Sequence, residues 1–283
     1  MNRLKALFIT IFLSYLIILL VISTYWLLSG PFSFGWTGVE ISVLFPFLYY
    51  LRYYAAPKPR TGRLWLVSSL VLFGVVLTFY PLVFTPDKIE FPTVWLSLCT
   101  YLLWILYVGW YSRFSRTSSK HLKVGKSLPD FQLQTLENNS FSSSQLSGKK
   151  SLLLFYRGNW CPFCMAQITE LIAHYKKLAQ RGVDVYIISS QPREFTRKLA
   201  AKHKVPVQFL MDKDNKAAEE LGILHKSGTP AGLHFFGYHQ DTAYPTVILS
   251  DENGKVLFAH ETDNYRYRPE PQVFLHILDK YAE

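Results

Sequence analysis

Three long stretches without a charged side chain decide what the first part of this chain can fold into. They cover residues 6–28, 64–85 and 91–111. The hydrocarbon core of a bilayer is about 30 Å thick, so a helix needs roughly 20 apolar residues to cross it. A helix also satisfies its own backbone polar groups where no water is available. Each of the three stretches therefore predicts a transmembrane helix.

A fourth apolar stretch, residues 38–57, is interrupted by Pro46 and bracketed by Glu40 and Arg52. Both charged side chains can reach a membrane interface, and the tyrosines of this stretch suit an aromatic belt. We therefore count it as a span, which gives a four-helix transmembrane region over residues 1–112. A cleaved signal peptide is the alternative for residues 6–28. The apolar run is longer than the 7 to 15 residues typical of such a signal, so we expect an uncleaved anchor.

Basic residues flank the predicted spans mainly on one side of the membrane. Lys88 is the exception among twelve, and the other eleven are Arg3, Lys5, Arg52, Lys58, Arg60, Arg63, Arg113, Arg116, Lys120, Lys123 and Lys126. The positive-inside rule places this side, with both termini, in the cytoplasm. We expect a multi-pass protein of a bacterial inner membrane whose C-terminal half is cytoplasmic. If residues 38–57 do not cross, that half lies on the opposite side.

The chain changes character after residue 112. The first 112 residues hold 7 of the 30 Lys and Arg and 3 of the 20 Asp and Glu, and the remainder has the composition of a soluble domain. Residues 113–126 contain five basic residues and no acid, which predicts a basic juxtamembrane linker attracted to anionic lipid by about 1 kcal/mol per residue. A lipid bilayer therefore accounts for the net charge of +10, and we expect no nucleic-acid partner because no recognition motif follows.

Residues 127–283 show strands alternating with helices and then a hairpin and a final helix, a pattern typical of a mixed α/β sheet. Short apolar runs predict strands, helical spacing predicts helices, and SDENGK predicts a hairpin turn. The expected strands are residues 151–156, 183–188, 207–211, 246–249 and 256–260. The expected helices are residues 162–180, 193–203, 215–221 and 272–281.

The chemistry concentrates in the sequence RGNWCPFC, which follows the first of these strands directly. Cys161 falls at a helix N-cap, and Pro162 at the first helical position, where its missing N–H costs nothing. Cys164 lies on the same helical face, within reach of a disulfide. The helix dipole favours negative charge at Cys161, so we expect Cys161 to be the more acidic and more exposed thiol, with Arg157 adding to this if it folds back. The motif therefore predicts a dithiol redox centre.

Two other interpretations of the cysteine pair are a zinc site and an inert buried pair. Structural zinc needs four ligands, and the third cysteine, Cys99, lies in a predicted span where it is expected to act as a small apolar residue. We expect no metal and no cofactor. The aromatic segment from residue 222 to residue 244 could form a lid or a metal site through His225, His234 and His239. Without regular ligand spacing it is better explained as a surface insertion.

The stretch from SLPDF through the cysteines resembles the start of peroxiredoxin-like proteins of the alkyl hydroperoxide reductase and thiol-specific antioxidant family. The sequence DENGKVLFAH is similar to the hairpin of that family. Residues 244–246, YPT, resemble the cis-proline corner that faces the active cysteine in thioredoxin folds, with Pro245 as the proline. The resemblance implies a thioredoxin-like α/β domain over residues 127–283, with Cys161, Cys164, Arg157, Trp160 and Pro245 as site residues.

The sequence departs from that family at the peroxide-binding positions. Efficient peroxiredoxins carry Pro and Thr or Ser seven and three residues before the active cysteine, and here Leu154 and Gly158 stand there. Phe155 replaces the acidic residue of thioredoxins. The resemblance thus implies a membrane-anchored thiol-disulfide oxidoreductase with an antioxidant role, which reduces disulfides or hydroperoxides and is itself reduced by a thioredoxin-type dithiol donor. The alternative is a non-catalytic membrane redox sensor, switched by a disulfide between the same two cysteines.

Overall fold

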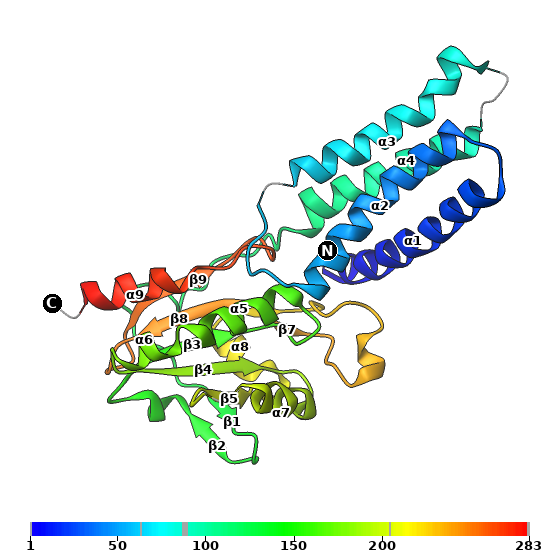
Figure 1. The fold of residues 1–283 in the computed structure, drawn as a ribbon. Coiled ribbons are helices and arrows are strands. Elements are labelled where there is room, and N and C mark those ends of the chain that lie inside the picture. Colours follow the sequence, from blue (N-terminus) through cyan, green and yellow to red (C-terminus); the bar gives the residue numbers. More distant parts are fainter. Residues whose placement is uncertain (1, 63, 87–89, 204, 282–283) are drawn as a thin grey trace. The chain divides into compact units, whose positions relative to one another are not determined.

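The computed structural model describes residues 2–62, 64–86, 90–203 and 205–281 (Figure 1). Arg63 and Lys88, which contribute to the orientation argument, lie outside these ranges. The chain divides into two compact units, one of Met1–Ala6, Lys58–Arg60 and Phe114–Glu283 and the other of Leu7–Pro57 and Thr61–Arg113. We describe each unit by itself.

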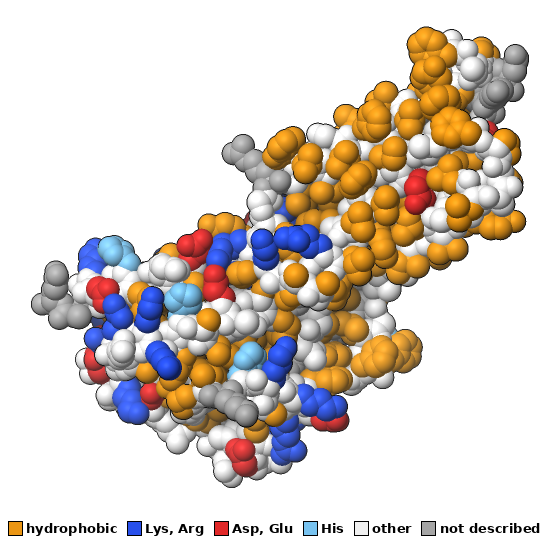
Figure 2. Space-filling model, viewed as in Figure 1, with side chains coloured by type: hydrophobic (Ala, Val, Ile, Leu, Met, Phe, Trp, Pro, Cys, Tyr) orange, Lys and Arg blue, Asp and Glu red, His pale blue; other side chains and the backbone are white. Residues whose placement is uncertain are grey.

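Four long helices, α1 to α4, correspond to the four predicted spans. Each is long and apolar enough to cross a membrane. Figure 2 shows hydrophobic side chains over the outside of this helical unit, as expected for a surface that faces lipid. The weak second span is a continuous helix despite Pro46, and α4 ends in one π-helical turn, Tyr107–Tyr111. The helices are α1 (Asn2–Ser29), α2 (Phe34–Ala55), α3 (Trp65–Phe84) and α4 (Phe91–Leu106).

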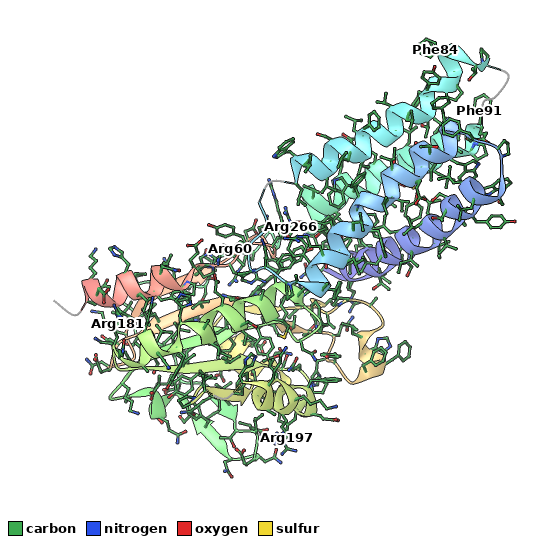
Figure 3. The ribbon with its side chains drawn as sticks, viewed as in Figure 1. Arg60, Phe84, Phe91, Arg181, Arg197 and Arg266 are labelled. Carbon is green, nitrogen blue, oxygen red and sulfur yellow. The ribbon has the colours of Figure 1, made fainter. Side chains whose placement is uncertain are left out.

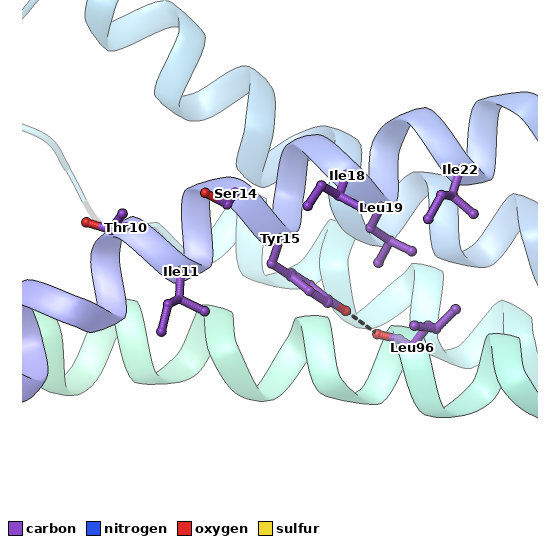
Figure 4. A pocket seen from close by; sticks show the side chains of 8 residues that line it. All are labelled: Thr10, Ile11, Ser14, Tyr15, Ile18, Leu19, Ile22 and Leu96. Carbon is purple, nitrogen blue, oxygen red and sulfur yellow. Dashed lines mark hydrogen bonds between the residues drawn. The ribbon is translucent and has the colours of Figure 1, made fainter. Parts of the chain in front are cut away.

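Small and hydroxylated residues let these helices approach each other closely. A Cβ added to Gly38 of α2 would lie 2.5 Å from the carbonyl oxygen of Gly74 of α3, so the two backbones are in direct contact there. Thr78 and Ser97 join α3 to α4 by a hydroxyl hydrogen bond of 3.0 Å. A shallow apolar groove runs along α1, where the Tyr15 hydroxyl donates to the carbonyl oxygen of Leu96 at 3.0 Å (Figure 4).

A seven-stranded mixed sheet forms the centre of the other unit, in the order β2-β1-β5-β4-β3-β8-β9 (Figure 1). The strands β3, β4 and β5 are parallel, β8 pairs antiparallel with β3, and β9 pairs antiparallel with β8. Nearly every residue of β3, β4 and β8 is buried, as expected for central strands covered on both faces. The strands are β1 (Gln132–Gln134), β2 (Ser140–Ser142), β3 (Lys150–Phe155), β4 (Val183–Ser189), β5 (Gln208–Met211), β8 (Thr246–Ser250) and β9 (Val256–Glu261).

The helices of this unit follow the predicted pattern with one difference. The predicted helix 162–180 is broken at His174, whose φ of −99° and ψ of 3° lie outside the helical range. At the end of the domain, Arg181 pairs with Asp279 of α9 at 2.6 Å (Figure 3). The helices are α5 (Pro162–Ala173), α6 (Tyr175–Ala179), α7 (Arg193–Lys202), α8 (Lys216–Glu220) and α9 (Pro271–Lys280).

Two segments are more ordered than the sequence indicates. The insertion between α8 and β8 contains a small antiparallel pair, β6 (Leu224–His225) with β7 (Thr242–Ala243). The segment 113–126 packs along the domain, because Phe114 and Leu122 are buried and Arg116 pairs with Glu261 at 2.5 Å. Arg116 therefore forms its ion pair inside the domain, and its charge is not available to lipid head groups.

Candidate active site

The cysteine pair lies where β3 ends and α5 begins. Tyr156 to Trp160 form the turn between them, and Cys161 is the N-cap of α5, as the motif predicts. The backbone of the first helical turn closes on Cys161, whose carbonyl oxygen accepts from the N–H of Cys164 at 3.0 Å and of Met165 at 3.1 Å. The carboxyl ends of parallel strands are the usual edge for a site in an α/β sheet. The fold therefore places the turn that carries the cysteines at that edge.

Both cysteines are free thiols and both are buried, with exposed fractions of 2% for Cys161 and 0% for Cys164. Burial raises the pKa of Cys161, and the hydrogen bond that its thiol donates to the Cys164 sulfur raises it further. For Cys164, burial opposes ionisation, but that same hydrogen bond and the nearby charge of Arg268 lower its pKa to about 5. The prediction that Cys161 is an exposed thiol is wrong, because both cysteines are buried. That Cys161 is the more acidic of the two stays a prediction.

The Arg157 side chain is held in place by one hydrogen bond and two aromatic rings. Its Nη2 donates to the carbonyl oxygen of Gly228, and its guanidinium carbon lies 4.5 Å from the centre of the Trp160 ring and 5.5 Å from that of Phe114. The carbonyl oxygen of Arg157 accepts from the hydroxyl of Thr242 at 2.8 Å. Arg157 does fold back toward the turn, and its charge favours the thiolate form of both cysteines.

The indole of Trp160 fills the space beside Gly158. A Cβ at Gly158, where φ is 154°, would lie 2.5 Å from Trp160 Nε1, so a Thr or Ser at this position would clash with the indole. Trp160 Nε1 is itself a buried donor without an acceptor in the part of the chain that the structure describes. The Trp160 N–H, which is also a hydrogen-bond donor, thus lies where a Thr or Ser at residue 158 would place its side chain.

Several residues that support this turn have no motif in the sequence. The side chain of Gln191, just after β4, accepts from the Asn159 N–H at 2.7 Å and donates to the Tyr156 hydroxyl at 3.0 Å. The Tyr238 hydroxyl donates to Asn159 Oδ1. Gln191 comes just after β4, which pairs with β3. Its place at the end of a neighbouring strand is the one signal in the sequence that could have indicated Gln191 as a site residue.

Pro245 lies directly before β8, whose first residue, Thr246, is paired with Phe155 at the end of β3. The backbone therefore brings Pro245 to the edge of the sheet that carries the cysteines. The described residues contain no cis peptide bond, so the peptide before Pro245 is trans and the expected cis-proline corner is not formed. Tyr244 occupies this corner instead, with its ring stacked on His225 at 4.3 Å and beneath the guanidinium of Arg116 at 4.5 Å.

The histidines of the insertion are not gathered into one site. His225 is buried, and burial together with Arg157 holds its pKa well below the usual value. His234 lies against Phe235, which is 82% exposed, and His239 is also exposed. Within residues 2–62, 64–86, 90–203 and 205–281, no group of three His, Cys, Asp or Glu residues could hold a metal ion.

Comparison with known proteins identifies this domain. Residues 124–259 match the AhpC/TSA family. They form an AhpC/TSA domain. Peroxiredoxin Bcp of Escherichia coli (strain K12) is 26% identical over 161 residues, which are 57% of this chain and 98% of that protein. The thiol-disulfide oxidoreductase ResA of Bacillus cereus is 24% identical over 148 residues, which are 44% of this chain and 82% of that protein.

Solved structures resemble the AhpC/TSA domain as well. The crystal structure of peroxidoxin BcpB from Mycobacterium tuberculosis covers 56% of this chain and 98% of its own, with 20% identity and a TM-score of 0.47. The predicted thioredoxin-fold, peroxiredoxin-like domain is confirmed by the family match and by the sheet, and so is its assignment as an oxidoreductase.

Proposed function

We propose that this chain is a membrane-anchored dithiol oxidoreductase of the thiol peroxidase type, in which Cys161 attacks the substrate and Cys164 resolves the intermediate. The observation that carries the proposal is the buried Cys161–Cys164 pair at the start of α5, joined by a thiol hydrogen bond and surrounded by buried arginines. Relatives named peroxiredoxin and thiol-disulfide oxidoreductase support hydroperoxides and disulfides as substrates.

The reaction begins with the Cys161 thiolate, which the nearby charges of Arg157 and Arg268 favour. The Cys161 sulfur attacks while the Cys164 thiol keeps its proton. A hydroperoxide loses its O–O bond, Cys161 becomes a sulfenic acid, and the alkoxide takes the proton from Cys164 to leave as an alcohol. The Cys164 thiolate then attacks the Cys161 sulfur and expels hydroxide, which leaves a disulfide for a thioredoxin-type dithiol donor to reduce.

A disulfide substrate follows the same route without the oxygen chemistry. Cys161 attacks one sulfur and releases the other as a thiolate, which takes the proton, and Cys164 then displaces the second sulfur from the mixed disulfide. Leu154 and Gly158 leave no hydroxyl to orient a peroxide, so we expect protein disulfides to react at least as readily as hydroperoxides. Trp160 Nε1 and the charge of Arg157 are the groups available to hold a peroxide oxygen.

Two cysteine variants of the full chain test the assignment of roles. Cys161→Ser should abolish the reduction of both substrates. Cys164→Ser should stop turnover but trap a mixed disulfide or a sulfenic acid at Cys161, detected by mass spectrometry. Turnover by Cys161→Ser, or an adduct at another residue, would contradict the proposal.

The relative preference for substrates needs its own measurement. The rate constants for oxidation of Cys161 by hydrogen peroxide and by a protein disulfide are compared under the same conditions. A peroxide reaction faster by orders of magnitude than that of an ordinary thiolate would establish an efficient peroxidase despite the altered positions.

The burial of both sulfurs favours one further candidate, a redox sensor that changes conformation without turnover. A sensor would form the disulfide once per oxidation event and would be reduced slowly. Sustained turnover with a thioredoxin-type donor would exclude this candidate. A single stoichiometric oxidation without turnover would favour it.

A further inference from the structure

The insertion between α8 and β8 extends from the sheet and carries two exposed phenylalanines (Figure 1). Phe235 is 82% exposed and Phe236 is 68% exposed. The next most exposed large apolar side chain among the described residues after 113 is Val124, at 60%. Single exposed apolar residues are ordinary on a protein surface, but adjacent aromatic rings exposed to this degree indicate a contact with a partner.

The two rings are held outward by an ordered turn. Residues Leu233–Phe236 form one turn of 3₁₀ helix, between Gly232 with a φ of 93° and Gly237 with a φ of 81°. At the base of the insertion, the N–H of Thr229 donates to the carbonyl oxygen of Gln240 at 3.1 Å, and β6 pairs with β7. The exposure of the phenylalanines is therefore a property of the fold.

The insertion is hydrogen-bonded to the first turns of α1. The N–H of Ala231 donates to the carbonyl oxygen of Ala6 at 3.0 Å. Asn2 Nδ2 donates to the carbonyl oxygen of Lys226 at 2.9 Å. These residues of α1, up to Ala6, belong to the same compact unit as the insertion. The apolar run of the first predicted span begins at residue 6, so Ala6 marks the level at which α1 enters a bilayer.

The exposed tip, Leu233–Phe236, lies close to this level. Phe235 is four residues along the chain from Ala231, and an extended chain covers at most about 3.6 Å per residue, so the two lie within about 14 Å of each other. The head-group region adds several Å to each side of the hydrocarbon core. A bilayer crossed by α1 therefore brings its head groups within reach of both phenylalanines.

The charges near the tip suit an anionic lipid surface. Arg3 and Lys226 are exposed on the two segments that are hydrogen-bonded to each other. Residues 222–241 contain one acidic residue, Asp241, whose carboxylate accepts from the N–H of Ser227 at 2.6 Å. Exposed aromatic residues beside basic ones are typical of segments that lie in a membrane interface.

We propose that the tip Leu233–Phe236 is a membrane contact of the redox domain, with Phe235 and Phe236 placed among the lipid head groups beside the start of α1. This inference rests on the membrane anchoring in the proposed function. The hydrogen bonds to the first turns of α1 favour the bilayer as the partner, over a soluble protein or a second copy of the chain.

The same insertion supports the turn that carries the cysteines. The carbonyl oxygen of Gly228 accepts from the Arg157 side chain, and the Thr242 hydroxyl donates to the carbonyl oxygen of Arg157 at 2.8 Å. The Tyr238 hydroxyl donates to Asn159 Oδ1. A tip fixed in the interface therefore holds this turn near the bilayer surface, which favours a substrate delivered from the membrane over one free in solution.

The test uses the full chain reconstituted into vesicles of phosphatidylethanolamine and phosphatidylglycerol. Phe235 is replaced by the photo-crosslinker p-benzoylphenylalanine, and the adducts formed on irradiation are identified by mass spectrometry. We expect a lipid adduct at residue 235.

Tyr281 takes the same replacement as the matched control, because it is an exposed aromatic residue of the same domain. It follows α9, whose Asp279 pairs with Arg181 just before β4, at the edge of the sheet opposite to the cysteines. Its lipid adduct should be weaker than that at residue 235 by about tenfold or more.

A charge at the tip supplies a second measurement. With the crosslinker at residue 236, Phe235→Asp should lower the yield of lipid adduct by about fivefold or more, because anionic lipid repels a carboxylate. Phe235→Leu keeps an apolar side chain and should retain most of the yield. Both variants change an exposed side chain, so the thermal midpoint in detergent should stay the same.

Four results would overturn the proposal. They are an adduct of residue 235 with a second chain, an adduct with another part of the same chain in place of lipid, equal lipid adducts at residues 235 and 281, and equal yields in Phe235→Asp and Phe235→Leu. Val21 of α1, which is 65% exposed, carries the crosslinker in a parallel sample. A lipid adduct at residue 21 without one at residue 235 refutes the tip contact alone. Absence of an adduct at both residues contradicts the membrane anchoring of the proposed function as well.

Discussion

At the scale of single residues, the relation between Gly158 and Trp160 explains how this site differs from a standard peroxiredoxin. Sequence comparison notes only that a hydroxyl is missing at residue 158. The structure adds that the Trp160 indole fills that position and that its N–H is buried without an acceptor among the described residues. A buried donor left without an acceptor costs about 1–3 kcal/mol, and an oxygen of a bound substrate would relieve that cost.

We therefore predict that Trp160→Phe slows the oxidation of Cys161 by hydrogen peroxide by about tenfold, because the donor is lost while the aromatic face under Arg157 is kept. The rate of attack on a protein disulfide should change much less, since it needs no oxygen to be held. Stopped-flow measurements with both oxidants check this. Equal slowing of the two reactions would mean that Trp160 acts through packing alone.

The residues of the site were predictable to the extent that they lie together in the sequence. Cys161 and Cys164 were predicted from their spacing, Arg157 from its place just before them, and Trp160 from the resemblance to the family. Arg268 lies 104 residues beyond Cys164 in an irregular loop, and no periodicity or motif connects the two.

At the scale of elements, the segment 113–126 is bound to β9 through one buried ion pair. The side chains of Arg116 and Glu261 are 3% and 10% exposed, and Glu261 also accepts from the backbone N–H of Ser119 at 2.9 Å. Removal of one partner of a buried pair leaves the other charge uncompensated, which is more costly than the loss of both.

Arg116→Met should therefore lower the unfolding free energy of the redox domain by about 3 kcal/mol. The double variant Arg116→Met with Glu261→Gln should recover a large part of this loss. The unfolding free energies of the single and the double variant are measured by urea unfolding, with the hydrogen exchange of peptides from β9 as the probe. A double variant that is no more stable than the single one would show that the geometry of the pair matters more than its charge balance.

The contact between α2 and α3 makes a second prediction at this scale. Gly38→Ala places a methyl group 2.5 Å from the Gly74 carbonyl oxygen, and backbone atoms cannot move aside cheaply. We expect a loss of about 1–3 kcal/mol, typical of overpacking, seen as a lower thermal midpoint in detergent. Gly109→Ala, a helical glycine with open space around it, is the matched control. An equal effect of both changes would contradict close packing at Gly38.

Most helices and strands were predicted from the spacing of apolar residues and from the turn residues between them. The exceptions have physical causes. The strands 151–156 and 183–188 were predictable because buried central strands are continuous apolar runs. The break at His174 was not, since no glycine or proline marks it. The pair of β6 with β7 was missed because each strand has two residues and their pairing spans an irregular loop.

At the scale of the whole molecule, the distribution of basic residues predicts that the redox domain faces the cytoplasm. A reporter active only outside the cytoplasm, fused after residue 283, should be inactive, and a cytoplasmic fluorescent reporter should be bright. The reverse fusions after residue 31, between α1 and α2, serve as the control. An active external reporter at the C-terminus would overturn the orientation and would place the dithiol in a more oxidising compartment.

The packing of residues 114–126 bears on how the redox domain can be produced as a water-soluble fragment. The family match begins at residue 124, and a fragment designed on it, or on the sequence boundary at residue 127, would omit Phe114, Arg116 and Leu122. It would remove the Phe114 ring that lies against Arg157 and would leave Glu261 without its cation. A fragment that starts at Arg113 retains these contacts, so residues 114–126 belong to the redox domain and contribute Phe114 to the packing around Arg157.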